Sequence, residues 1–131
     1  MKGFGQKDKS QIKKISKSNN TLSNQEIIHR ALKLHSKGKI KEAAIYYQYF
    51  INQGFQDGNV FSNYAVILRS FKKFKEAEKF LRKAIEIAPN FAMAYSNLGN
   101  TLYDLGKLKE AEKFLRKAID IDPYYVMSYS N

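Results

Sequence analysis

One segment of this chain occurs twice with almost no change between the copies. Lys75–Ile87 reads KEAEKFLRKAIEI and Lys109–Ile121 reads KEAEKFLRKAIDI, so the copies repeat with a 34-residue period and differ by one conservative change. Pro89 and Pro123 keep the same interval, and so do three alanines: Ala43, Ala77 and Ala111. A fixed period of this length indicates one supersecondary unit stacked on copies of itself. Stacked helix pairs form extended binding surfaces rather than catalytic pockets.

Helical spacing within the period predicts three gapless repeats, 24–57, 58–91 and 92–125, each made of two helices and a short turn. Ser23 and Glu26 form a capping box, which predicts a helix that begins at Asn24. In the third repeat, apolar and small residues at three- and four-residue spacing share one helical face: Tyr95, Leu98, Gly99 and Leu102. Gly106 then suits the positive φ found where a helix ends. Lys72 occupies this place in the second repeat, at a cost of about 1 kcal/mol if the turn needs positive φ.

The second helix of the third repeat is expected to present five residues on its inner face: Leu108, Ala111, Leu115, Ala118 and Ile119. The first repeat departs from the pattern. Phe50 stands where the other repeats have Ala84 and Ala118, and Phe55 stands where they have proline. Terminal repeats are often atypical because only one side of them is covered.

The N-terminal residues 1–22 differ in composition from the repeats. Within 1–20 there are six lysines and one aspartate, and the whole chain has a net charge of +11. So few apolar residues cannot offset the entropy of ordering, and we expect a disordered basic leader. It resembles a solubilising segment more than a nucleic-acid or lipid contact, because Phe4 is its only aromatic residue. With no cysteine, no signal peptide and no apolar run of about 18 residues, a cytoplasmic protein without a membrane span is expected.

The last residues begin the pattern again. Residues 126–131, VMSYSN, match AMAYSN at 92–97, so a fourth repeat starts inside the chain. So short a segment can neither hold a helix nor cover the third repeat. We therefore expect a piece of a longer protein or a truncated gene product, with an apolar surface that favours self-association. That surface is expected to contain Leu108, Leu115, Ile119 and Tyr125.

From about Asn24 onward, the residues resemble the tetratricopeptide repeat family. The third repeat carries the family's pattern at Tyr95, Leu98, Gly99, Leu102, Ala111, Leu115, Ala118 and Pro123. The second repeat carries it at Phe61, Tyr64, Ala65, Leu68, Ala77, Leu81, Ala84 and Pro89. The resemblance implies an all-α fold, a right-handed α-solenoid of helix-turn-helix repeats over 23–131. The family is a generic scaffold, so the resemblance is specific for fold and much less so for function.

The segment YSNLGN of the third repeat is similar in sequence to the repeats that precede O-linked N-acetylglucosamine transferases and to those of related bacterial proteins. In that group a row of asparagines grips the backbone of a bound peptide. The matching peptide-binding positions here are Asn63, Asn97 and Asn131, with Asn100 one turn further on, whereas the first repeat has His29. Alternatively, these amides satisfy buried groups between adjacent repeats. Members that bind acidic chaperone tails need Lys and Asn where Ile28 and Leu32 stand, which argues against that ligand.

Residues for catalysis or metal binding are not indicated. His29 and His35 are spaced so that they fall on different faces of one helix, and no Gly-rich phosphate loop follows a predicted strand. We therefore expect no enzyme activity and no cofactor. Two clusters of tyrosine are typical of helix packing more than of a binding surface. They comprise Tyr46, Tyr47 and Tyr49, and then Tyr124 and Tyr125.

The sequence predicts a non-enzymatic scaffold that binds an extended peptide or protein segment on a concave face lined by the first helices. The alternative hypothesis makes it the substrate-presenting N-terminal region of a larger transferase, glycosyltransferase-like, whose catalytic domain lies elsewhere. Nucleic-acid binding is the least favoured. Nucleic-acid binding would be recognised by its salt dependence. With six phosphate contacts, the logarithm of the binding constant falls against the logarithm of the salt concentration with a slope of about −5.

Overall fold

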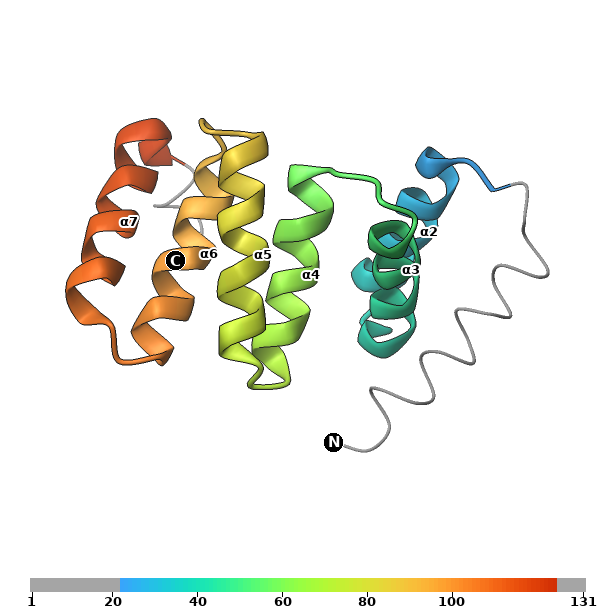
Figure 1. Ribbon diagram of the computed structural model, residues 1–131, viewed down its shortest axis with the longest axis horizontal. Helices are drawn as coiled ribbons and strands as arrows, with labels where there is room; N and C mark the ends of the chain where they lie inside the picture. The colour runs from blue at the N-terminus through green and yellow to red at the C-terminus, as the bar shows by residue number, and fades with distance from the viewer. Residues whose placement is uncertain (1–21, 125–131) are drawn as a thin grey trace. The chain divides into compact units, whose positions relative to one another are not determined.

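The computed structural model of this protein describes residues 22–124, and within that range every regular element is a helix (Figure 1). The basic leader, except for Leu22, and the start of a fourth repeat at 126–131 lie outside the described residues. So do Tyr125 and Asn131. The all-α class expected from the 34-residue period is confirmed.

Three helical hairpins follow one another along the described chain. The first contains α2 (Asn24–Ser36) and α3 (Ile40–Asn52), the second α4 (Gly58–Ser70) and α5 (Phe74–Ile87), and the third α6 (Ala92–Asp104) and α7 (Leu108–Ile121). The first helices therefore begin at the constant interval that the sequence period predicts, and so do the second helices. None of the helices described in 22–124 has the length and apolar character needed to cross a membrane.

Local signals account for the helix ends. The Ser23 hydroxyl accepts a hydrogen bond from the Glu26 amide at 3.2 Å, and the Asp57 carboxylate accepts one from the Val60 amide at 3.0 Å. Each satisfies an amide that a helix N-terminus leaves without a partner in the helix. Glu26 also places negative charge at the positive end of the α2 dipole.

The turn inside each hairpin has the same backbone conformation. Its central residue has a φ of 78° at Gly38, 62° at Lys72 and 79° at Gly106. The amide of the next residue donates back to the helix carbonyl five positions earlier, as Lys73 does to Leu68 at 2.8 Å. Positive φ at this place lets the chain turn while it satisfies a helix C-terminal carbonyl. Lys72 adopts it as well, so the condition on which the sequence analysis based its local energetic cost is met.

The chain divides into two compact units, residues 1–55 and 56–131. In the first unit, α2 packs against α3 around Ile27, Ala31, Ala43 and Tyr47, all of which are buried. Phe50 is also buried there, and its ring lies 5.4 Å from that of Phe55. This aromatic pair occupies the places that an alanine and a proline hold in the other repeats, so the two departures from the pattern compensate for each other.

The second unit contains α4 to α7. Contacts join α4 to α5, α5 to α6, α6 to α7 and also α4 to α6. Its core consists of apolar side chains at helical spacing, including Ala65, Leu68, Ala77, Leu81, Ala84, Leu98, Leu102, Ala111 and Ala118. Leu108 and Ile119, which were expected on the apolar surface left for a following repeat, are 59% and 45% exposed.

Candidate functional site

One face of the second unit is lined by amide and neutral side chains from two neighbouring helices. On α4 it contains Asn59, Asn63 and Val66, and on α6 it contains Met93, Asn97 and Asn100. Three- and four-residue spacing places each set on one side of its helix. On α4 that side lies opposite Phe61 and Tyr64, whose rings pack against Phe80 of α5 at 5.7 and 5.1 Å. We call this surface the amide face.

Asn97 lies at the junction of the two helices. Its side chain is buried, and its Nδ2 donates a hydrogen bond of 3.1 Å to the Ser62 hydroxyl on α4. The Thr101 hydroxyl donates to the Asn97 carbonyl at 2.8 Å. Buried polar groups are stable only when they are paired, so this bond holds α6 against α4 directly beneath the amide face.

Asn63 and Asn100 are more accessible. Both side chains are half-exposed, and Asn59 beside them is exposed. Of the four predicted peptide-binding asparagines, the structure therefore places three on one face, and Asn131 lies outside the described residues.

An ion pair closes one end of the amide face. The Arg69 guanidinium at the end of α4 donates to the Asp104 carboxylate at the end of α6. Tyr103 beside it is 65% exposed. The other end has an open hollow of about 480 Å³ between the start of α4 and the loop that precedes α6. It is lined by Asp57, Gly58, Asn59, Ala88, Pro89, Asn90 and Phe91.

Sequence reasoning missed Asn59, Met93 and the Arg69–Asp104 pair. The first two could have been found, because they lie four positions before Asn63 and Asn97 on the same helical side. The ion pair could not, because Arg69 and Asp104 are far apart in the chain and the spacing alone does not orient their side chains.

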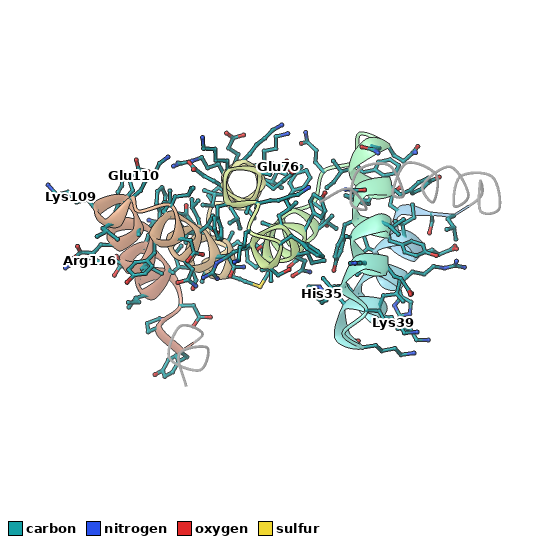
Figure 2. All side chains as sticks on the ribbon, turned by 90° about the horizontal axis from the view of Figure 1, so that it is seen from below. His35, Lys39, Glu76, Lys109, Glu110 and Arg116 are labelled. Carbon is teal, nitrogen blue, oxygen red and sulfur yellow. The ribbon has the colours of Figure 1, made fainter. Side chains whose placement is uncertain are left out.

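A second hollow, of about 650 Å³, lies along the outer side of α7. Tyr95 and Phe114 form its aromatic part, with stacked rings whose centroids are 6.2 Å apart. Its other lining residues are charged and recur at helical spacing: Lys109, Glu112, Lys113, Arg116, Lys117 and Asp120. Figure 2 shows Lys109, Glu110 and Arg116 extending outward from α7. Mixed charges of this kind are typical of a solvated helix face.

The histidines lie in the first unit. His35 Nδ1 is 3.3 Å from the Tyr47 hydroxyl, and the two rings meet edge to face at 6.1 Å. Burial lowers the pKa of His35 below its ordinary value of 6.5. Tyr47 and Tyr49 are buried, as the packing interpretation of this tyrosine cluster predicted. Among residues 22–124, no group of three or more histidines and carboxylates could hold a metal ion.

Charged residues join the second and third repeats on the side away from the amide face. Lys107 Nζ lies 3.4 Å from a Glu78 carboxylate oxygen, and Arg82 donates to Glu78 at 2.9 Å and to Glu110 at 3.0 Å. Burial by itself raises the pKa of Glu78, but the bonds and charges of Arg82 and Lys107 outweigh it, so the net pKa is lowered. The carboxylate therefore remains ionised between its two cationic partners.

Comparisons with known proteins agree with this geometry. The family model described as tetratricopeptide repeat matches residues 56–123, slightly more than half of the chain. No curated protein sequence matches the chain. Among solved structures, the first tetratricopeptide domain of Spaghetti (RPAP3), bound to the HSP90 peptide SRMEEVD, is 23% identical with a TM-score of 0.72. That similarity covers 81% of this chain and 86% of the other.

Two further structures are similar. The MamA crystal structure is 19% identical with a TM-score of 0.75, over 86% of this chain and 65% of that one. The Arabidopsis OM64 domain of the same repeat type is 21% identical with a TM-score of 0.72, over 77% of this chain and 84% of that one. At such identities the similarity establishes the fold alone.

Proposed function

This chain belongs to the tetratricopeptide repeat family, and from that membership we propose that it is a non-enzymatic scaffold whose amide face binds an extended peptide. The observation that carries the proposal is the row of accessible asparagines on α4 and α6, on the side of α4 opposite the packed aromatic rings. Each carboxamide offers an acceptor and two donors, which match the carbonyl and amide of a peptide group. Backbone recognition of this kind depends little on peptide sequence.

Asn63 and Asn100 are the proposed direct contacts, because their side chains are half-exposed. Asn97 belongs to the same line, where its bond to Ser62 sets the separation of α4 and α6. Asn131 would extend the line by one repeat, and this stays a prediction. An apolar side chain of the peptide fits the hollow beside Asn59, since Ala88, Pro89 and Phe91 line it.

The chemistry of the amide face favours a neutral peptide. Its arginine, Arg69, is already paired with Asp104. Ile28 and Leu32 stand where recognition of acidic chaperone tails requires Lys and Asn, as the sequence resemblance implied. Spaghetti (RPAP3) was solved with the acidic peptide SRMEEVD, and we expect this chain to bind that peptide no better than a scrambled control.

The test begins with peptides selected from a displayed random library against the wild-type chain. Asn63→Ala and Asn100→Ala should each remove two hydrogen bonds to the selected peptide and so weaken its binding by about 1–3 kcal/mol. This corresponds to a rise in Kd of roughly 5- to 150-fold. Asn52→Ala, an exposed asparagine at the end of α3, serves as the matched control and should leave Kd unchanged. Unaltered affinity in both variants would exclude the amide face as the site.

Stability separates the roles of the asparagines. Asn97→Ala leaves the buried Ser62 hydroxyl without its partner and should lower the free energy of unfolding by about 1–3 kcal/mol. Asn63→Ala should change it by no more than about 0.5 kcal/mol, as at most surface positions. A large loss of stability in Asn63→Ala would indicate a structural amide and contradict its role as a contact.

A transferase context is the second proposal. It depends on the similarity of the YSNLGN segment at 95–100 to repeats that precede glycosyltransferase domains. In that case the amide face would present a protein substrate to a catalytic domain on the same polypeptide. Sequencing the gene downstream of the codon for Asn131 tests this directly, and an early stop codon would contradict it.

A further inference from the structure

Helix α6 packs on the second hairpin with one buried polar contact. Asn97 Nδ2 donates to the Ser62 hydroxyl at 3.1 Å, and the side chains of both residues are buried. Helix α6 contacts both helices of that hairpin, α4 and α5. A buried hydroxyl is stable only when it is paired. Ser62 therefore acts as the acceptor for a carboxamide on the helix that packs over it.

Ser96 occupies the same place in the next repeat. It lies 34 residues after Ser62, on α6 instead of α4, and only 4% of it is exposed. Within residues 22–124, its hydroxyl forms no hydrogen bond. A buried hydroxyl without a partner lowers stability. The third repeat is therefore built to receive a donor at Ser96, as the second repeat receives Asn97 at Ser62.

The chain leaves α7 with the same backbone conformation as it leaves α5. Ala88 has a φ of −131° and a ψ of 82°, and its counterpart Asp122 has a φ of −147° and a ψ of 90°. The amide of each donates to the carbonyl four positions earlier at 2.9 Å, and a proline follows each of them. Pro123 and Tyr124 are helical, so the chain adopts helical backbone again after α7, a little earlier than it does after α5.

The next segment of the sequence carries a matching donor. Residues 126–131, which lie outside the described residues, read VMSYSN, whereas residues 92–97 at the start of α6 read AMAYSN. Asn131 is the counterpart of Asn97, just as Ser96 is the counterpart of Ser62. Ser96 and residues 126–131 belong to the same compact unit, 56–131. A pair between them therefore involves this unit alone.

We propose that residues 126–131 dock on the third hairpin and that the Asn131 carboxamide donates to the Ser96 hydroxyl. The contact repeats the bond from Asn97 to Ser62, with the same residue types at the same interval. A segment this short neither holds a helix by itself nor covers the whole third repeat. Its order depends on the bond to Ser96 and on packing against α6 and α7.

Hydrogen exchange of the full chain, followed by NMR, tests the docking. The backbone amides of 127–131 and the Asn131 carboxamide should exchange roughly tenfold or more slowly than those of a free peptide with the sequence of residues 122–131. Asn97 provides the reference, because its carboxamide is bonded to Ser62. Exchange in the full chain at the rate of the free peptide would overturn the proposal.

Two variants test the pairing itself. Ser96→Ala removes the acceptor and should return the Asn131 carboxamide to the exchange rate of the free peptide. Ser70→Ala is the matched control, because the Ser70 hydroxyl donates to the Ile67 carbonyl of its own helix at 2.6 Å, and it should leave the exchange unchanged. Circular dichroism checks that the variants are folded.

Asn131→Ala gives an independent measurement that leaves α6 unaltered, so it decides the question if Ser96→Ala does not fold. It removes the donor and should speed the exchange of the 127–130 amides toward that of the free peptide. Slow exchange that persists in a folded Ser96→Ala variant or in Asn131→Ala would contradict the proposed pairing. An equal effect of Ser70→Ala would show that the exchange does not report on Ser96, and would also contradict it.

Discussion

Lys72 is the one non-glycine residue with a positive φ among residues 22–124. Its φ is 62°, whereas Gly38 and Gly106 hold the same turn in the other hairpins at 78° and 79°. Positive φ destabilises the folded state by about 1–2 kcal/mol at a residue with a Cβ. Glycine avoids this cost, but it lowers stability by about 0.5–1 kcal/mol because it has more conformational freedom in the unfolded chain. The turn has thus kept its geometry at a local energetic cost.

Lys72→Gly should therefore raise the free energy of unfolding by about 0.5–1 kcal/mol, measured by urea denaturation. Gly106→Lys is the reverse exchange. A Cβ at Gly106 meets nothing within 4 Å, so the expected loss of similar size comes from the backbone alone. No change in either variant would show that the turn relaxes away from positive φ at little cost.

His35 should make stability depend on pH. Burial lowers its folded pKa below 6.5, so the unfolded chain takes up a proton first as the pH falls. The contribution of neutral His35 to the free energy of unfolding is complete above about pH 6.5. It is lost as the pH falls from there toward the folded pKa. The difference in unfolding free energy between wild type and His35→Gln should shrink over this window. His29→Gln, at an exposed position on the same helix, is the control, and a difference independent of pH would contradict the assignment.

At the scale of the helix pair, Gly99 sets how closely α6 and α7 approach. A Cβ added there would lie 2.5 Å from Leu115 Cγ and 3.2 Å from the Ala111 carbonyl oxygen. The second repeat has Ala65 at this place, against Leu81. The second repeat thus accommodates a methyl group at a place where the third repeat has Leu115 instead.

Gly99→Ala should lower the free energy of unfolding by up to about 2 kcal/mol. Overpacking costs about 1–3 kcal/mol, and the better helix propensity of alanine offsets about 1 kcal/mol of that. Gly58→Ala is the matched control, because its Cβ would stay at an ordinary 3.4 Å from Ala88, and its stability should not fall. Thermal unfolding compares the two, and a more stable Gly99→Ala variant would mean that Leu115 moves aside freely.

At the scale of the whole molecule, the chain has two compact units, and the second presents large apolar side chains on α7. A repeat with the sequence of residues 92–125 and a polar outer face, placed after Tyr125, should cover Leu108, Leu115 and Ile119. Full burial of each is worth about 1.5–3 kcal/mol, so the melting temperature should rise and self-association should disappear. The same extension with lysine at its contacting apolar positions is the control. An unchanged melting temperature would show that these three side chains need no cover.

Sequence signals predicted the helical part of this fold well because they act over short distances. The capping residue Ser23 and the positive φ at Lys72 depend on neighbours within a few residues, and the structure contains both. The amide face was only partly predictable. The 34-residue period pointed to Asn63 and Asn97 as equivalent, but it carried no information on what each side chain touches.

The sequence by itself determined the all-α class, the helical period and the turn conformations, since these follow from local backbone preferences repeated along the chain. Tertiary structure alone decided how equivalent residues differ. Asn97 is buried because Ser62 lies across from it, whereas Asn63 is half-exposed. Leu81 is buried and Leu115 is not, although their helices are nearly identical, because another hairpin packs over α5. Burial and pairing depend on partners far away in the chain, and a repeated sequence specifies a surface without specifying what covers it.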